Sequence, residues 1–513
     1  MNEIKVRGSG FLLHITSLPS AYGIGDLGSM SFRFVDLLRK GDQKYWQILP
    51  LTPVDPERSD SPYKSTSVLA GNKLLISPEL LLKDGYVDSI EPLPEFPEGK
   101  VLYSEVNDYK NMLLEKAYND MRSRGPPDGY LTFCDKNQDW LEDYALFEAL
   151  KTHVGREKPW NEWPEELRDR DPRALKDMTN TLYDLVDMER FSQYIFHNQW
   201  SKLKRYCNRN SIQIIGDMAI YVDMDSVDVW KNPEIFKLNS EKRPTYVSGV
   251  PPDYFSETGQ LWGNPVYSWD ILKKRGYDWW LKRIERNFEL YDILRIDHFR
   301  GFSKYWEVEA GETTAINGKW REGPGSLFFE SVLSRFPNVS LVAEDLGVIT
   351  PDVRELMNAY DLPGLKVLMF GFDEEMPYNI HAPHNVPVNS IVYTGTHDNN
   401  TVKGWFENEV DRDSINRLSE YLDTHIDIEN VSTQMVRCAL RTSANTSIIP
   451  LQDLLGLDEN SRMNDPSTPH GNWKWRMTGD DWKRLSGDII ERFRRWTWLY
   501  GRGYKTIRPV VSQ

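Results

Sequence analysis

Short, nearly continuous apolar runs recur along the chain, each rich in β-branched or aromatic residues. Stretches long enough for a helix and its loops separate most of these runs from one another. The runs occupy residues 11–15, 45–51, 212–222, 292–299, 339–347, 365–372, 390–398 and 446–455. Because their apolar residues do not alternate with polar ones, they are typical of parallel strands covered on both faces.

The segment between the first two runs has the period of a helix instead. In residues 31–40, Phe32, Val35 and Leu38 fall on one side of a helix, as expected for a helix that packs on a sheet. Eight strands with helical spacers predict an α/β protein built as a (β/α)8 barrel. A doubly wound parallel sheet is the alternative that the pattern leaves open.

Two long segments interrupt this alternation. Residues 58–200 separate the second and third runs, are far too long for one crossover helix and are rich in charged, helix-favouring residues. We expect them to form a mostly helical inserted subdomain. Residues 248–265 are crowded with proline and glycine, which predicts a loop insertion at the active site. The whole chain, 1–513, is then a single catalytic barrel.

Charge and cysteine content narrow the class of protein. The chain has 513 residues and a formal charge of −15, which argues against a nucleic-acid backbone as the main partner. No apolar stretch reaches membrane-spanning length, and residues 1–10 lack the apolar core of a secretory signal. Cys134, Cys207 and Cys438 are far apart and in no paired motif, so we expect reduced thiols in a cytoplasmic protein.

The aromatic content adds a first indication of a ligand. The chain carries 18 tryptophans and 25 tyrosines, and flat rings stack well on the apolar faces of sugars. The alternative is that these rings are buried in the core of a large protein.

Charged residues gather where several predicted strands end, which is the edge that carries the active site in barrels of this kind. The polar residues at these ends are Asp217, Arg295, Asp297, Glu344, Asp345, His397 and Asp398. Taken singly, each could belong to a structural ion pair or a solvated turn. Their recurrence at successive strand ends favours a catalytic cleft.

Carboxylates in one cleft repel each other, so the pKa of at least one should rise. One ionised and one protonated carboxyl group is what cleavage of a glycosidic bond requires. Arg295 and Asp297 leave the same face of a strand, and we expect the guanidinium to keep Asp297 ionised, as a nucleophile must be. Glu344 shares a face with Val342, and this apolar neighbour should favour its protonated form.

Three other patterns carry less weight. The stretch GIGDLG at 23–28 matches a dinucleotide fingerprint, but turn residues separate it from the preceding strand, so we expect a loop turn. The stretch HAPH at 381–384 lies in a proline-rich loop without a local thiol or carboxylate, which disfavours zinc. No G-x-S-x-G occurs to indicate a serine nucleophile.

Several long motifs, in consistent order from about residue 8 to 500, resemble the 4-α-glucanotransferases known as amylomaltases or disproportionating enzymes. The motifs are GFLLHITSLPSAYGIGDLG, YWQILPLTP, DSPYKSTSVLAGN, GDMAIYV, GVPPDYFSETGQLWGNPVY, LRIDHFRGF, VAEDLGVIT, PGLKVLMFGFD, YTGTHDNNT and RMNDPSTPHGNWKWR. The resemblance implies the α-amylase superfamily: a (β/α)8 barrel with inserted subdomains, no separate C-terminal β-domain and a retaining double displacement.

The resemblance also implies roles for individual residues. Asp297 matches the nucleophile, Glu344 the general acid/base and Asp398 a third carboxylate that binds sugar hydroxyls and stabilises the transition state. Arg295, His298 and His397 match the lining of the subsite of the cleaved sugar, Tyr63 a ring beneath that sugar, and Trp262 an aromatic platform near the acceptor. Further polar contacts to glucose units match Ser61, Asp217, Asp253, Gln260, Asp373 and Asn464.

The implied reaction moves α-1,4-glucan segments from a donor maltooligosaccharide to the 4-hydroxyl of an acceptor glucan or glucose. The resemblance implies no metal and no organic cofactor, and the segment 248–265 could shield the intermediate from water. A hydrolase of the same superfamily and a catalytically silent glucan-binding protein are the alternatives. One departure stands out, because Arg58 replaces a tyrosine that relatives often use in a second glucan-binding groove.

Overall fold

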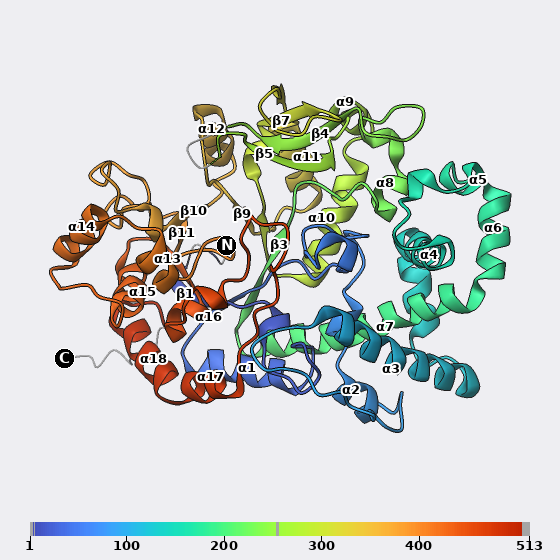
Figure 1. The fold of residues 1–513 in the computed structure, drawn as a ribbon, viewed down its shortest axis with the longest axis horizontal. Coiled ribbons are helices and arrows are strands. Elements are labelled where there is room, and N and C mark those ends of the chain that lie inside the picture. The colour runs from blue at the N-terminus through green and yellow to red at the C-terminus, as the bar shows by residue number, and fades with distance from the viewer. Residues whose placement is uncertain (1–3, 5, 253–255, 505–513) are drawn as a thin grey trace, which may run out of the picture.

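The computed structural model describes residues 4, 6–252 and 256–504, and its centre is a sheet of eight parallel strands (Figure 1). In spatial order these are β10 (Gly364–Val367), β11 (Ser390–Tyr393), β12 (Thr446–Pro450), β1 (Gly8–Leu12), β2 (Tyr45–Gln47), β3 (Gln213–Met218), β6 (Ile293–Ile296) and β9 (Leu341–Ala343). The Ala343 amide donates to the Pro363 carbonyl at 3.0 Å and joins β9 to the start of β10. The predicted (β/α)8 barrel is therefore confirmed, and the open doubly wound sheet is excluded.

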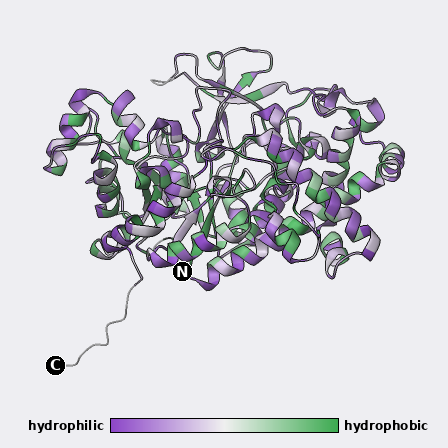
Figure 2. Cartoon of the chain, turned by 60° about the horizontal axis from the view of Figure 1, so that its bottom comes forward, coloured by the Kyte–Doolittle hydropathy of each residue, from purple (hydrophilic) through white to green (hydrophobic). Residues whose placement is uncertain are grey.

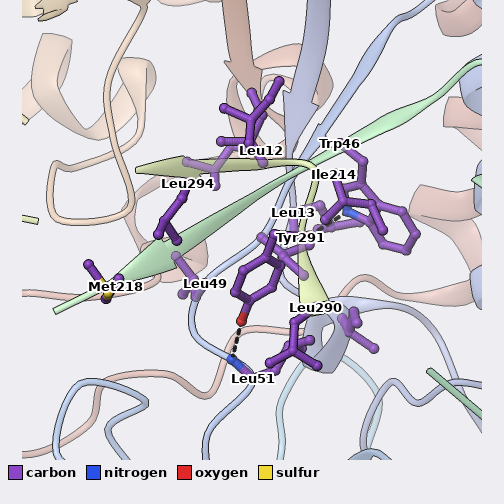
Figure 3. Close-up of a cluster of buried hydrophobic side chains, with 14 of the residues drawn as sticks. Leu12, Leu13, Trp46, Leu49, Leu51, Ile214, Met218, Leu290, Tyr291 and Leu294 are labelled. Atoms are coloured by element: carbon purple, nitrogen blue, oxygen red, sulfur yellow. Dashed lines mark hydrogen bonds between the residues drawn. The ribbon is translucent and has the colours of Figure 1, made fainter. Parts of the chain in front are cut away.

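Each of the eight apolar runs supplies one barrel strand, because a parallel strand between two covered faces needs apolar residues on both sides. Figure 3 shows the packing where β1, β2 and β3 meet, with Trp46 and Ile214 among the buried side chains. Two polar atoms of this cluster are satisfied within it. The Trp46 indole donates to the Leu13 carbonyl at 2.8 Å, and the Leu51 amide donates to the Tyr291 hydroxyl at 3.1 Å.

The helix predicted within 31–40 is α1 (Ser29–Lys40), which buries Val35 and Leu38 and half-buries Phe32. The stretch GIGDLG forms the turn before it, as expected, and the Gly28 amide donates to the Asp26 carboxylate at 2.9 Å. Other helices cover the barrel between strands: α10 (Asp278–Leu290), α11 (Gly325–Arg335), α12 (Pro351–Ala359), α13 (Val402–Asn408), α15 (Val431–Arg441) and α18 (Ile490–Leu499). The helices in Figure 2 show both hydrophilic and hydrophobic bands, as expected of helices with one covered face.

Between β2 and β3 the chain is largely helical. It forms α2 (Pro78–Lys83), α3 (Tyr103–Arg124), α4 (Tyr130–Val154), α5 (Glu165–Arg168), α6 (Pro172–Thr181) and α7 (Tyr183–Arg209). In Figure 1 α3 to α6 lie to the right of the barrel, and α7 runs back beneath it to β3. The helix α7 packs on both α4 and α1, so it connects the helices of this segment to the barrel wall.

A small antiparallel sheet lies beside the barrel, at the top of Figure 1. Its order is β5 (Gln260–Pro265), β4 (Tyr246–Val250), β7 (Lys304–Glu309) and β8 (Lys319–Glu322). The prediction of a loop at 248–265 is therefore wrong for both ends of that segment, which belong to β4 and β5. The strand β4 forms because it pairs with β7, which follows about 60 residues later, and local proline and glycine content does not reveal such a partner.

Candidate active site

The neighbouring strands β3 and β6 bring Asp217 and Arg295 into register. One guanidinium nitrogen of Arg295 (Nη1) lies 2.7 Å and 2.6 Å from the two Asp217 oxygens, and both side chains are buried. The other (Nη2) lies 2.9 Å from Asp297 Oδ1. Arg295 thus bridges two carboxylates and fixes the position of Asp297 directly after β6.

Glu344 follows β9 and is held against the same segment. The Glu344 amide donates to the Ile296 carbonyl at 3.0 Å. Its carboxylate accepts two backbone N–H bonds, from His298 at 2.7 Å and from Leu346 at 2.7 Å. His298 has φ of 47°, in the left-handed region, and this turn points its amide at Glu344.

Asp398 completes the group through a row of polar contacts. Asp398 Oδ2 lies 3.3 Å from His397 Nε2, which lies 2.8 Å from the Tyr63 hydroxyl. That hydroxyl donates to Asp217 at 2.8 Å. Arg295 then links Asp217 to Asp297, so side chains from β3, β6, β9 and β11 form one site at the carboxyl ends of the strands.

The pKa of Asp297 is raised to about 8, chiefly by burial and also by the charges of Asp217, Glu344 and Asp398, while Arg295 acts to lower it. Arg295 therefore favours the ionised form of Asp297, as expected, but its effect on the pKa is smaller than that of burial. The effect of Arg295 is also limited because one of its nitrogens contacts both oxygens of Asp217 and only the other contacts Asp297.

The pKa of Glu344 is also raised, chiefly by burial, although its two backbone N–H bonds and Arg295 lower it. This direction agrees with the expectation for Glu344. Two neighbouring carboxyl groups whose pKa values are both raised titrate as a pair, and we expect this pair to share one proton near neutral pH.

The two histidines of the site are neutral. Burial lowers the pKa of His298 to about 4 and also lowers that of His397. Burial raises the pKa of Tyr63, so its hydroxyl stays protonated and donates a hydrogen bond to Asp217. His397 Nε2 then carries the hydrogen in its contact with Tyr63, because the tyrosine oxygen can only accept there.

Two rings flank this polar network. Tyr63 stacks on His397 at 5.4 Å between ring centroids and an interplanar angle of 9°. Trp262, on β5, meets His298 edge-on at 4.7 Å, and its indole donates to Gln260 at 3.1 Å. The small sheet therefore reaches the barrel site through Trp262, and Gln260 lies beside that ring on the same strand.

The remaining residues expected to contact sugar differ in their burial and in their hydrogen-bond partners. Ser61 is buried, and its hydroxyl accepts from the Tyr63 amide at 3.3 Å. Asn464 donates to Asp398 Oδ1 at 2.7 Å. Asp373 accepts from Asn379 at 3.0 Å within its own exposed loop, so the expected sugar contact of Asp373 rests on the resemblance. Asp253 lies outside the described residues.

Two residues of the C-terminal segment were missed. Arg462 donates to the Asp398 carbonyl at 3.0 Å, and Trp473 packs its ring against Tyr63 and His397. Both lie in RMNDPSTPHGNWKWR, far from any strand end, so no pattern of strands pointed to them. The signal that could have found Trp473 is the concentration of aromatic residues in that motif.

Arg58 is part of a buried ion cluster. Its guanidinium contacts Asp55 at 2.7 Å, Asp223 at 3.0 Å and Asp225 at 2.8 Å, and Lys151 from α4 contacts Asp225 at 2.8 Å. The Arg58 side chain is 10% exposed. It joins the loop after β2 to the loop after β3 and to the helical segment, and it offers no flat ring to a glucan.

No group of three or more His, Cys, Asp or Glu side chains is arranged to hold a metal ion in the described part of the chain. In the stretch HAPH, the Nδ1 atom of His381 accepts from the Val367 amide at 3.1 Å. This nitrogen therefore satisfies a backbone donor at the end of β10. The absence of a cofactor remains a prediction.

The comparisons with known proteins agree with one another. A family model described as 4-alpha-glucanotransferase matches residues 13–481. A 4-alpha-glucanotransferase of Aquifex aeolicus is 46% identical over 476 residues, covering 93% of this chain and 96% of that protein. One of Streptococcus pneumoniae is 44% identical over 503 residues, covering 97% and 98%.

Solved structures show the same relationship. An amylomaltase from Streptococcus agalactiae, in complex with acarbose, superposes with a TM-score of 0.92 at 39% identity and covers 97% of this chain and 100% of that one. An amylomaltase from Corynebacterium glutamicum, at 16% identity and a TM-score of 0.76, shares the fold and covers 96% of this chain and 75% of its own.

Proposed function

The chain belongs to the 4-alpha-glucanotransferase family, whose members transfer glucan segments by a retaining mechanism, and on this premise we propose Asp297 as the nucleophile and Glu344 as the general acid/base. Asp398 is the third carboxylate, which binds hydroxyls of the reacting sugar and stabilises its oxocarbenium-like transition state. The observation that carries these assignments is the row of side-chain contacts that joins Asp297 to Asp398, together with the His298 amide that holds Glu344 next to Asp297.

The reaction proceeds in two displacements. Glu344 gives its proton to the glycosidic oxygen while Asp297 attacks the anomeric carbon, so the reducing-end fragment leaves with a free 4-hydroxyl and a covalent glucosyl ester forms. Glu344, now a carboxylate, takes the proton of an acceptor 4-hydroxyl as that oxygen attacks the same carbon. The ester bond breaks, Asp297 leaves as a carboxylate, and configuration is retained.

The proton that starts this sequence is the one that the coupled pair retains at neutral pH. Asp297 must be ionised and Glu344 protonated for the first displacement, so the proton must reside on Glu344 when the donor is bound. Arg295 favours this distribution because its Nη2 contact with Asp297 strengthens as Asp297 becomes charged. The cleft therefore needs no outside acid at neutral pH.

The sugar-binding residues have separate tasks in this proposal. Tyr63 supplies the ring beneath the cleaved sugar, and Arg295, His298 and His397 line its subsite. Trp262 forms an aromatic platform near the acceptor. Polar contacts to glucose units come from Ser61, Asp217, Asp253, Gln260, Asp373 and Asn464.

Incubation with maltotriose alone tests the proposed disproportionation. Transfer to a 4-hydroxyl gives glucose together with a ladder of oligomers longer than the substrate, resolved by chromatography. Products that are only shorter than maltotriose would show a hydrolase of the same superfamily and contradict the proposal. Asp297→Asn should give no turnover while still binding acarbose, and a variant that still turned over would overturn the assignment of the nucleophile.

The proposal also covers the cellular location, the substrates and the domain organisation of the enzyme. Within the described residues no helix combines the length and apolar character needed to cross a bilayer. Cys134, Cys207 and Cys438 are free thiols, which supports a cytoplasmic location. The substrates are α-1,4-glucans, maltooligosaccharides and glucose. We place one catalytic barrel in 1–513, with 58–200 as a mostly helical inserted subdomain and 248–265 as an insertion beside the active site.

A further inference from the structure

Trp473 has a backbone conformation that large side chains rarely adopt. Its φ is +66°, in the left-handed region that favours glycine, and Gly471 two residues earlier shows the same sign at +94°. A bulky residue with positive φ is an outlier, and such outliers persist only where the surrounding structure holds them. A glycine would adopt this conformation without strain, yet the residue at this position is tryptophan, which has the largest of the standard side chains.

Both backbone groups of Trp473 are tied to other segments. Its amide donates to the Met463 carbonyl at 2.7 Å, and its carbonyl accepts from the Tyr103 hydroxyl, at the start of α3, at 3.0 Å. The next residue, Lys474, accepts from the Val101 amide at 2.7 Å. The segment carrying Trp473 is thus fixed between the helical insertion and the residues next to Asn464.

The ring of Trp473 is directed at the sugar-binding pair. It is 7% exposed and lies 5.6 Å from the Tyr63 ring and 6.2 Å from the His397 ring, with interplanar angles of 41° and 40°. Tyr63 and His397 are themselves nearly parallel. The indole therefore contacts both members of the stack and limits how far either ring can tilt.

The same segment fixes the third carboxylate. The Asn464 amide donates to the His397 carbonyl at 3.1 Å, and its side chain donates to Asp398. Because the Trp473 amide binds the Met463 carbonyl, the strained turn at Trp473 is tied to Asn464, which binds both the His397 carbonyl and the Asp398 carboxylate.

We propose that Trp473 is a positioning residue for the glucosyl transfer: it holds the planes of Tyr63 and His397 so that their polar atoms meet the sugar at the cleaved bond. This inference rests on the proposed roles of Tyr63 and His397. Trp473 itself acts through these two rings, and the strained turn at its backbone brings the indole onto both of them.

A purely structural role predicts a different outcome from a positioning role. A buried tryptophan that only fills space affects stability, and below the unfolding temperature the folded enzyme keeps its turnover number. A positioning residue affects the turnover number of the folded enzyme, with a smaller effect on KM, because misaligned rings lose contacts made in the transition state.

The experiment measures kcat, KM and Tm for Trp473→Phe and Trp473→Leu with maltotriose as substrate. Trp482→Leu is the matched control, because Trp482 is 9% exposed and lies in α17 (Gly479–Arg484) with Arg33 against its ring. We expect Trp473→Leu to lower kcat about 10- to 100-fold, and Trp473→Phe, which keeps a smaller ring, to lower kcat by less but still more than about twofold. Trp482→Leu should lower Tm without lowering kcat.

A double-mutant cycle with Tyr63→Phe gives the second readout. If Trp473 acts through Tyr63, the double variant Trp473→Phe, Tyr63→Phe loses less kcat than the product of the two single losses. Strictly multiplicative losses, or a kcat within twofold of the parent enzyme for Trp473→Leu, overturn the proposal. Trp473→Phe, the smaller change, decides the question if Trp473→Leu does not fold.

These outcomes are distinct from failure of the proposed function. A parent enzyme that makes no ladder from maltotriose contradicts the transfer reaction itself. A parent enzyme that makes the ladder, with Trp473 variants equally fast, contradicts only the role of Trp473.

Discussion

Replacing Asp217 by asparagine should move the alkaline limb of the pH–rate profile to lower pH. Asp217 is one of the groups whose charge raises the pKa of Asp297. Asparagine keeps the shape and one acceptor oxygen for Arg295 and Tyr63 but removes the charge. Arg295 then has Asp297 as the carboxylate that it contacts, and the coupled pair of Asp297 and Glu344 loses its last proton at lower pH.

The size of the shift follows from the geometry. Arg295 contacts Asp217 at 2.6 Å and Asp297 at 2.9 Å through its two terminal nitrogens, so the two carboxylates are close neighbours. Two charges ~7 Å apart at an effective dielectric constant of about 20 interact by about 2 kcal/mol. Since 1.36 kcal/mol corresponds to one pKa unit, we expect the alkaline limb to move down by about one to two pH units.

The direction of the change in activity with pH follows from the pKa of Asp297. The pKa of Asp297 is raised to about 8, so the parent enzyme keeps the necessary proton up to that region and loses activity above it. In Asp217→Asn the proton is lost earlier, so activity at pH 8 relative to pH 6 falls. The assay is kcat/KM for glucose release from maltotriose between pH 5 and 10, at a temperature where both proteins are folded.

Asp228→Asn is the control for loss of a buried carboxylate. Asp228 is 3% exposed, burial raises its pKa to about 6, and it accepts from the Val68 amide away from the three carboxylates. It should leave the position of the alkaline limb unchanged. An alkaline limb that stays in place in Asp217→Asn, or that moves equally in Asp228→Asn, refutes the electrostatic reasoning.

Three further predictions concern single features of the molecule. Glu344→Gln should lower turnover of maltotriose about 10²- to 10⁴-fold because the general acid is lost, and near-normal rates would exclude Glu344 from that role. Arg58→Ala should lower the free energy of unfolding by about 3–5 kcal/mol, because it leaves buried carboxylates without their partner, and Arg58→Lys should recover part of this loss. A thermal unfolding midpoint within one degree of the parent for Arg58→Ala would contradict that account. Dialysis against a chelator should leave the maltotriose reaction unchanged, and activity lost to the chelator and restored by a metal ion would show a cofactor that the sequence does not predict.

The barrel could be predicted because the apolar composition of each strand reflects its burial on both faces. A strand such as β11 (Ser390–Tyr393) needs apolar residues on both faces, and this requirement appears as a local apolar run. The small sheet could not be predicted in this way. All four residues of β8, Lys319–Glu322, are exposed and three are charged, so only pairing with β7 makes them a strand.

The carboxylate cleft was predictable for a related reason. Charges just after buried strands meet at one edge of a barrel. Asp297 and Glu344 directly follow β6 and β9, and Asp398 lies in the loop after β11. The raised pKa of Asp297 could not be predicted, because it depends chiefly on burial and on neighbouring carboxylates that only the fold brings together. Trp473 was missed because its place in the site depends on a C-terminal segment that crosses to Tyr63, and no local pattern encodes such a crossing.

The central claim is that Asp297 forms the covalent bond to the sugar with Glu344 as its acid and base. The most direct test treats Glu344→Gln with an α-glucosyl fluoride, whose leaving group needs no general acid, and maps the glucosylated peptide by mass spectrometry. We predict that the glucosyl ester accumulates on Asp297, because its release to an acceptor needs the missing base. A label on any other carboxylate, or product formation without a labelled peptide, would contradict the account.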